Sequence, residues 1–147
     1  MGDKLVSVEL EELDENECLS LLGEVGIGRL GFVDEGEVYI FPVNYVREAK
    51  SIAFRTGEGS HLYHTLFTNV ALEIDSTDAL SHEGWSVLVK GVGHLMTDAI
   101  DDLSRRLKMH GYEPWAPGAK GQWIRIDKPV ITGRRIVHKI KHTETSN

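Results

Sequence analysis

The chain has 147 residues, of which 41% are hydrophobic and 27% charged, and this is enough for one globular domain with its own core. Its net charge of −7 argues against non-specific binding of nucleic acid, which needs a basic surface. No stretch approaches the roughly 18 apolar residues of a membrane span. The start lacks the apolar core of a secretory signal, and the one cysteine, Cys18, suits a reducing compartment. We therefore expect a single cytoplasmic domain over residues 1–147.

The first half of the chain predicts one short helix among strands. Leu5–Leu10 alternates weakly between apolar and polar residues and is interpreted as an edge strand. Asp14 followed by Glu17 is typical of a helix start, and Gly23 closes that helix. Two apolar stretches then flank Asp34–Glu37, where a glycine can supply positive φ, so this region favours a hairpin. The strands expected after the helix are residues 27–33, 38–43 and 52–56.

The second half predicts further strands and two helices. Ser60 is a fair N-cap for a short helix over residues 61–67, and Thr97 or Asp98 can cap another that runs to about Lys108. The other expected elements are strands at residues 70–75 and 85–96, a loop at 112–118 and a final strand pair at 122–126 and 130–137. Two glycines in the 85–96 strand indicate a bend or a close backbone approach. Because strands outnumber helices and short turns join most of them, we expect a mainly β fold, a closed or partly closed antiparallel barrel with a few helices.

One segment has the composition of a phosphate cradle. Arg55 can supply a forked set of donors, Thr56 and Ser60 supply hydroxyls, and His61 begins a predicted helix whose positive end favours an anion. The same residues also fit a strand end, a turn and a capped helix with an exposed arginine. Just before them, Phe41–Val46 either lines a flat ring system or is an ordinary bulged barrel strand. Composition leaves these alternatives open.

Other groups of polar residues point less clearly to chemistry. His61 and His64 have a spacing that metal ligands can use, but no third ligand presents itself, so no metal site is predicted. No nucleophile-elbow motif supports a serine hydrolase. A basic stretch near the C-terminus is interpreted as a solvated strand edge, with contact to an anion as the alternative. It consists of Arg134, Arg135, Lys139 and Lys141.

The order and spacing of several short motifs are more specific than any of them alone. In chain order they are residues 28–31, 42–45, 54–57 with Ser60 beyond, 70–75, 84–87 and 89–92. With this series the chain resembles the FMN-binding split-barrel flavoproteins related to pyridoxamine 5'-phosphate oxidase, over roughly residues 15–135. The resemblance implies a six-stranded antiparallel split barrel that pairs as a homodimer, with one FMN at each of two sites between the subunits.

The resemblance also implies roles for individual residues. Three consecutive residues would pass along the isoalloxazine ring: Val43, Asn44 and Tyr45. The phosphate would be held by Arg55, Thr56, Ser60 and His61. Trp85 and Ser86 would approach the flavin further along the site, and Trp123 would either close the pocket from the partner chain or pack in the core. The implied activity is that of an FMN-dependent oxidoreductase acting on an unidentified small organic substrate, with no acid or base residue identified.

Two departures from the family pattern bear on that activity. Relatives usually carry a lysine where this chain has His61, so phosphate binding is expected to weaken as pH rises, or the site to be empty. True pyridoxamine-phosphate oxidases use an Arg-x-His element near the C-terminus, whereas here Arg134 and His138 lack that spacing. Pyridoxamine phosphate is therefore not the expected substrate. The alternatives are a deazaflavin coenzyme in place of FMN, and a non-enzymatic protein that binds or carries flavin, deazaflavin or haem.

Overall fold

A computed structural model describes residues 4–56, 61–96, 105–106 and 122–142 of the chain. Its elements are, in order, β1 Lys4–Leu13, α1 Glu15–Leu22, β2 Val25–Asp34, β3 Glu37–Glu48, β4 Ser51–Thr56, the 3₁₀ helix η1 His61–Thr65, β5 Asn69–Asp78, β6 Glu83–Leu95 and β7 Gln122–His142. Among the described residues no helix is long and apolar enough to cross a membrane.

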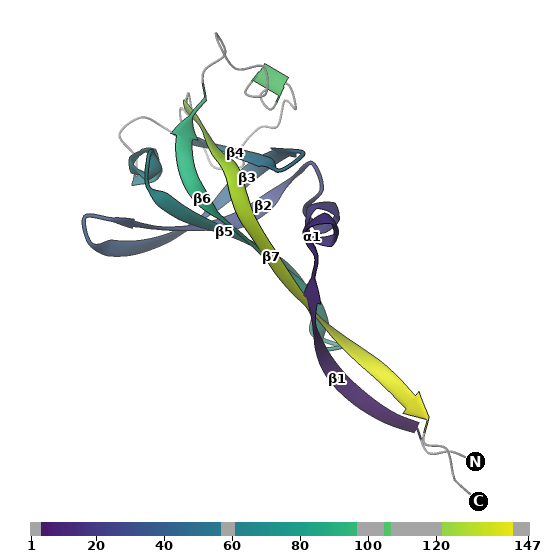
Figure 1. Ribbon diagram of the computed structural model, residues 1–147. Coiled ribbons are helices and arrows are strands. Elements are labelled where there is room, and N and C mark those ends of the chain that lie inside the picture. Colours follow the sequence, from purple (N-terminus) through teal and green to yellow (C-terminus); the bar gives the residue numbers. More distant parts are fainter. Residues whose placement is uncertain (1–3, 57–60, 97–104, 107–121, 143–147) are drawn as a thin grey trace, which may run out of the picture.

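The described strands form one antiparallel sheet that closes on itself. Its order is β1-β7-β4-β3-β2-β5-β6, and β6 also pairs with β7. That last pairing completes a ring made of β7, β4, β3, β2, β5 and β6, while β1 lies outside the ring on β7. Figure 1 shows the ring in its upper part, with α1 beside it. The expected six-stranded antiparallel barrel is therefore confirmed.

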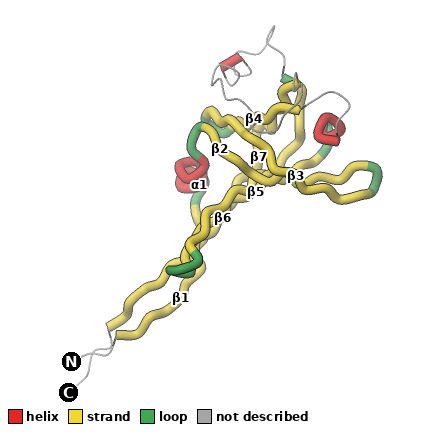
Figure 2. The backbone as a smooth tube through the Cα atoms, turned by 180° about the vertical axis from the view of Figure 1, so that it is seen from behind, coloured by secondary structure: helices red, strands yellow, loops and turns green. Residues whose placement is uncertain are grey.

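β7 continues beyond the barrel and forms a ribbon with β1. Its last part, from Gly133 to His142, pairs with β1 in full register. The ribbon twists as it leaves the barrel, and the described ends of the chain lie together at its tip (Figures 1 and 2). This arrangement confirms that the first apolar alternation of the sequence is an edge strand.

The core fills the inside of the barrel because alternate residues of each strand point inward. α1 adds to it with the buried Cys18 and Leu22. The side chain of Asp14 accepts a hydrogen bond of 2.8 Å from the backbone N–H of Glu17, which confirms the predicted helix start. The largest fully buried side chains are Tyr45, Phe54, Leu30, Ile52, Leu72, Ile124 and Ile126.

The predicted strand pair at the end of the chain is wrong, because the region is one strand. β6 pairs Lys90 with Val130 and Val92 with Asp127, so β7 has one more residue than β6 in this interval. The extra residue makes a β-bulge, and Lys128 within it has φ of +47°. Asp127, Lys128 and Pro129 separated the two predicted strands, whereas pairing with β6 on both sides makes these residues part of one strand. The bend expected at Gly91 lies directly opposite the bulge and is confirmed.

The hairpin, the remaining strands and the short helix were also predicted within the described residues, and the structure contains all of them. The turn between β2 and β3 has positive φ at Glu35 and Gly36, as a two-residue type I′ hairpin requires. The remaining predicted strands are present and most of them run longer than expected. The short helix after Ser60 is a five-residue 3₁₀ helix. Ser60 itself, the predicted loop at 112–118 and most of the predicted helix from 97 to 108 lie outside the described residues.

Candidate functional site

Three of the predicted site residues share the outer face of the barrel where β3, β4 and β7 meet. Arg55 pairs with Trp123 across β4 and β7, and its guanidinium carbon lies 5.4 Å from the centre of the indole ring. Asn44 directly precedes the pairing of Tyr45 with Phe54, so it follows on the same outer face as Arg55. We call Asn44, Arg55 and Trp123 the Arg55 patch. It combines an amide, a cation held over an aromatic ring and a flat apolar surface.

Three other predicted residues point into the barrel. Val43, Tyr45 and Thr56 are buried. The hydroxyl of Tyr45 donates a hydrogen bond of 2.7 Å to the backbone carbonyl of Leu22 in α1. The alternation of a strand sends neighbouring residues to opposite faces, so consecutive side chains of β3 cannot all lie along one ligand. Only the backbone of these three residues can border a ligand on the outer face.

Trp85 and Ser86 lie at the far end of the barrel from the Arg55 patch. Both stand at the start of β6, whereas the residue after its end, Met96, donates a backbone hydrogen bond to Trp123. At about 3.3 Å per residue, the length of β6 from Trp85 to Leu95 is about 33 Å. Within one chain the two groups therefore stand at opposite ends of β6, and neither Arg55 nor Trp123 lines the pocket that contains Trp85 and Ser86.

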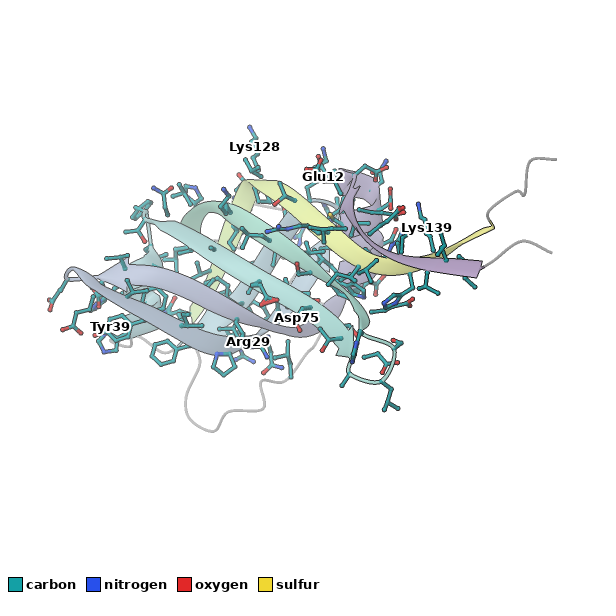
Figure 3. The ribbon with its side chains drawn as sticks, turned by 90° about the horizontal axis from the view of Figure 1, so that it is seen from below. Glu12, Arg29, Tyr39, Asp75, Lys128 and Lys139 are labelled. Carbon is teal, nitrogen blue, oxygen red and sulfur yellow. The ribbon has the colours of Figure 1, made fainter. Side chains whose placement is uncertain are left out.

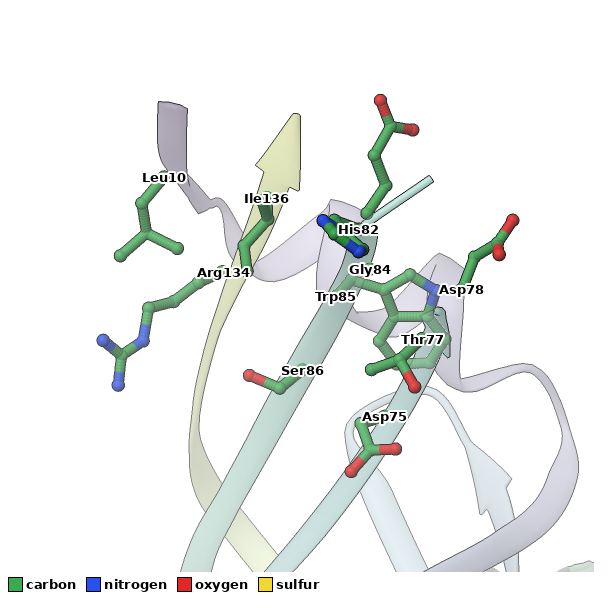
Figure 4. A pocket seen from close by; sticks show the side chains of 11 residues that line it. Leu10, Asp75, Thr77, Asp78, His82, Gly84, Trp85, Ser86, Arg134 and Ile136 are labelled. Atoms are coloured by element: carbon green, nitrogen blue, oxygen red, sulfur yellow. The ribbon is translucent and has the colours of Figure 1, made fainter. Parts of the chain in front are cut away.

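Trp85 and Ser86 line a pocket of about 460 Å³, which is within the usual range for small-molecule sites. Figure 4 shows the indole of Trp85 on one side and Arg134 on the other, with Ser86 between them. Ser86 pairs with Asp75 of β5 and with Arg134 of β7. The remaining lining residues are Leu10, Asp75, Thr77, Asp78, His82, Glu83, Gly84 and Ile136. The pocket thus offers one cation, a hydroxyl and an apolar wall beside several carboxylates.

The basic stretch near the C-terminus divides between this pocket and the ribbon. Lys139 contacts Glu9 and Glu11 of β1 at 3.1 and 2.8 Å, and Arg135 contacts Glu11 at 3.3 Å. The basic side chains on this face are solvent-exposed, but the stretch is not a strand edge, because β1 pairs with β7 along it. Arg134, one residue away, points to the opposite face and lines the pocket. Because neighbouring side chains of β7 point to opposite faces, Arg135 and Lys139 lie on the charged face of the ribbon while Arg134 reaches the pocket.

A pair of carboxylates beside the pocket was not predicted. Arg29 of β2 lies 3.2 Å from Asp75 and 3.7 Å from Glu73, both on β5. Figure 3 shows Arg29 and Asp75 close together on the outer surface. One carboxylate oxygen of Glu73 is buried and has no hydrogen-bond partner among the described residues. Burial, followed by the hydrogen bond and the charge of Asp75, raises the pKa of Glu73 to about 7. Glu73 and Asp75 are two positions apart in a strand, so their side chains lie on one face. This spacing is the sequence pattern from which the pair could have been predicted.

His61, expected at the flavin phosphate, contacts a carboxylate in this structure. The Nδ1 atoms of His61 and His64 each lie 3.0 Å from the same oxygen of Asp34, at the end of β2. These hydrogen bonds, that of His61 first, hold the pKa of Asp34 below its usual value. The ring of Tyr39 stacks on His61 with 4.5 Å between centres. Asp34 could not be predicted as their partner, because it precedes the histidines by 27 and 30 positions.

Comparison with known proteins agrees with this architecture. The profile of the pyridoxamine 5'-phosphate oxidase family matches residues 14–135. An uncharacterised protein of Mycobacterium tuberculosis is 29% identical over 135 residues, which are 88% of this chain and 87% of that protein. The solved structure of an FAD-binding protein from Mycobacterium smegmatis is 30% identical, with a TM-score of 0.64 over 86% of this chain and 98% of its own.

A second solved structure, a conserved protein of unknown function from Corynebacterium diphtheriae, is also 30% identical. Its TM-score is 0.69, over 87% of this chain and 98% of its own. The family match covers the barrel strands from β2 to β6 and β7 as far as Arg135. It therefore includes the Arg55 patch, Trp85 and Ser86. The chain therefore belongs to the pyridoxamine 5'-phosphate oxidase family.

Proposed function

We propose that this protein binds a flavin, FMN, at two equivalent sites between the subunits of a homodimer, and acts there as an oxidoreductase on a small organic substrate. The observation that carries the proposal is the position of the two halves of the expected site at opposite ends of β6. A twofold dimer can bring the Arg55 patch of one chain to the Trp85 pocket of the other, and its symmetry then gives two sites. The FAD-binding relative from Mycobacterium smegmatis supports a flavin as the ligand.

The residues of both halves fit the parts of a flavin. Arg55 presents a guanidinium that can bind phosphate through two parallel hydrogen bonds, and its contact with Trp123 fixes its direction. Trp123 packs against the buried Val46, Ala53 and Met96, so its indole is a supported flat surface. Asn44 adds an amide for hydrogen bonds to a ring edge. Thr56, Val43 and Tyr45 contribute backbone groups on the same strands.

The second half supplies the wall and the remaining polar groups. The indole of Trp85 and the hydroxyl of Ser86 lie in the pocket at the start of β6, and Arg134 adds a cation. When bound, a flavin supplies transfer of a hydride or of electrons. The protein's own residues then bind and orient it, while the two indoles exclude water from its faces.

The ribbon of β1 and β7 supports the proposed dimer. One of its faces is covered with ion pairs, among them those of Lys139 with Glu9 and Glu11. The other face is apolar and exposed, and its residues are Val6, Val8, Leu10, Ile136 and Ile140. An exposed apolar face of this length on a soluble-type fold marks a contact surface. Because this face continues into the pocket at Trp85, a second copy that covered it would also reach the pocket.

The flavin half of the proposal is tested by titration with FMN and with FAD, followed by flavin fluorescence. The substitution Arg55→Ala should weaken FMN binding by about tenfold or more, since it removes a charge-assisted contact with the phosphate. Lys50→Ala removes an exposed cation that pairs only with Glu15 among the described contacts, and it should leave the affinity unchanged. Equal effects of the two substitutions, or no binding of either flavin, would contradict the assignment.

The shared site is tested by complementation between two defective chains. Arg55→Ala damages one half and Trp85→Ala the other, so neither variant alone should bind FMN well. After subunit exchange, a mixed dimer carries one intact site and one doubly defective site, and about a quarter of the total capacity should return. No recovery, despite exchange shown by mass spectrometry of the intact dimer, would mean that each site lies within one chain. If light scattering shows a monomer, the flavin site cannot be shared between two chains either.

The oxidoreductase half is tested on the small molecules that co-purify with the protein. Each identified molecule is added to the flavin-loaded protein without oxygen, and the visible spectrum of the flavin is followed. Bleaching by one of them, reversed by air, is the expected result. A protein that keeps its flavin oxidised with all of them is a flavin-binding protein without this activity.

A further inference from the structure

We propose that Asp34, His61 and His64 form a binding site for one divalent transition-metal ion, such as Zn²⁺, on the outside of the barrel. The site lies where η1 meets the hairpin of β2 and β3. It is independent of the proposed flavin site, which uses the Arg55 patch and the Trp85 pocket. The sequence provided two of the three ligands, and the fold adds the third.

Secondary structure brings the three side chains together. His61 and His64 are three positions apart in a 3₁₀ helix, where residues at this spacing eclipse each other, so both rings project on the same side. Asp34 is the last residue of β2, and its carboxylate faces them. Both Nδ1 atoms lie 3.0 Å from its oxygen Oδ2, and one ligand atom from each of the three residues lies within 4.8 Å of the others.

The separations of the two histidine nitrogens from Asp34 are close to those of a metal centre. Zinc bonds to nitrogen and oxygen of about 2.0–2.2 Å place the ligand atoms of a tetrahedron about 3.3 Å apart. The two observed contacts of 3.0 Å therefore need to open by only a few tenths of an ångström. Each imidazole would bind through the lone pair of Nδ1, with its proton moved to Nε2. The ion would replace the two hydrogen bonds that now satisfy Asp34.

The ligands are held in place before any ion arrives. The ring of Tyr39 stacks on His61 at an angle of 24°, and the hydroxyl of Tyr39 donates a hydrogen bond of 3.0 Å to Glu37. The side chain of Asp34 is only 14% exposed, whereas those of His61 and His64 are 50% and 48% exposed. The carboxylate is thus anchored, while solvent reaches both rings. Three protein ligands leave one position for water.

Charge and ligand type select the class of ion. The hairpin carries three carboxylates, those of Asp34, Glu35 and Glu37, so the charge beside the cluster is negative. Two imidazoles with one carboxylate suit Zn²⁺, Fe²⁺, Co²⁺ or Ni²⁺, whereas Mg²⁺ and Ca²⁺ prefer oxygen ligands alone. Without metal, the same residues would only hold η1 to the hairpin through hydrogen bonds. The experiment must distinguish this hydrogen-bonded clamp from a metal site.

The test is a titration of the full chain with Co²⁺, after treatment with a chelator and in the absence of flavin. Visible absorption reports the coordination of the ion, and Zn²⁺ is then added in competition. We expect one ion per chain, with a dissociation constant for Zn²⁺ of about 1 μM or lower. Mg²⁺ in large excess should not displace it. Binding of less than one ion per chain, or only at millimolar Zn²⁺, would overturn the proposal.

Matched variants separate a metal site from a hydrogen-bonded clamp. His64→Asn and Asp34→Asn should each weaken Zn²⁺ binding by about tenfold or more. His82→Asn is the control, because His82 is exposed and outside the cluster, and asparagine tolerates its positive φ. Zn²⁺ should raise the melting temperature of the wild type and of His82→Asn, but not of the other two. If all four proteins respond alike to Zn²⁺, or none responds, the three residues are only a clamp.

The same titration on Arg55→Ala keeps the two proposals apart. This variant should lose FMN and keep its metal ion, since Arg55 is not among the three ligands. Loss of metal binding in Arg55→Ala would show that the metal site depends on the flavin site, and it would overturn their independence. Failure of flavin binding in the wild type leaves the expected metal titration unchanged.

Discussion

The carboxylate pair on β5 predicts a stabilising substitution whose effect depends on pH. Glu73 lies beside Asp75, with Arg29 at 3.7 Å from the one and 3.2 Å from the other. Burial of Glu73, then the hydrogen bond and charge of Asp75, raise its pKa to about 7, against an ordinary value of 4.5, and Arg29 only partly opposes them. Glu73→Gln keeps the shape of the side chain, removes the charge and supplies a donor for Asp75. We therefore expect this variant to be more stable than the wild type above pH 7.

The sign and the size follow from proton binding. A carboxyl group with a raised pKa binds protons more tightly in the folded state, so stability falls as pH rises from 4.5 to about 7, and the full cost remains above that window. At about 1.4 kcal/mol per pH unit, the change from 4.5 to about 7 corresponds to roughly 3 kcal/mol. The side chain of Glu73 is 35% exposed and that of Arg29 is 60% exposed, so solvent screening reduces the effect. We expect about 1–2 kcal/mol at pH 8.

The assay is urea unfolding of the wild type and Glu73→Gln at about pH 5 and about pH 8. The gain of about 1–2 kcal/mol at the higher pH should shrink to less than about 0.5 kcal/mol at the lower one. Glu12→Gln is the control, since Glu12 is exposed on β1, and it should change stability little at either pH. A gain of the same size at both values, or a loss at about pH 8, would refute the reasoning.

Three further substitutions test the packing by urea unfolding. Tyr45→Phe leaves the carbonyl of Leu22 without its 2.7 Å hydrogen bond and should cost about 1–2 kcal/mol, so an unchanged midpoint would remove the role of this bond. Lys128→Gly should raise stability by about 0.5 kcal/mol because φ is +47° there, and a loss would show that the lysine side chain matters more. Gly133→Ala places a Cβ 2.7 Å from the sulfur of Cys18 and should cost about 1–3 kcal/mol. If Gly133→Ala is as stable as the wild type, α1 can shift to make room for the added methyl group.

The parts of the fold that the sequence predicted well depend on local interactions. The helix start needs only Asp14 and Glu17, and the hairpin needs only two adjacent residues that accept positive φ, Glu35 and Gly36. The final strand pair was wrong because a turn and a β-bulge have similar local composition. Only the pairing of β6 with residues on both sides of Lys128 distinguishes them, and that pairing joins parts of the chain more than thirty positions apart. Distant partners of this kind leave no local signal.

The candidate site was predictable in its residue types and less so in its arrangement. Arg55 was expected at the ligand and Trp123 either at the ligand from the partner chain or in the core, whereas the structure places Trp123 against Arg55 of the same chain. Val43 and Tyr45 were expected beside Asn44, although strand alternation alone could have assigned them to the opposite face. Asp34 could not be predicted, because nothing local links the end of β2 to the histidines of η1. These differences show that residue type indicates chemistry, while the register of the strands decides which side chains can act together.

The length of β6 finally links ligand binding to assembly. In the proposed dimer, the Arg55 patch and the Trp85 pocket of one chain belong to different sites, so a single chain offers a flavin only half of its contacts at either end of β6. The dimer then binds FMN more tightly than the monomer does. By thermodynamic linkage, FMN must strengthen the association of the subunits by the same free energy with which association strengthens FMN binding. In this proposal the apolar face of the ribbon and the flavin site are two parts of one equilibrium, so each affinity depends on the concentration of the other component.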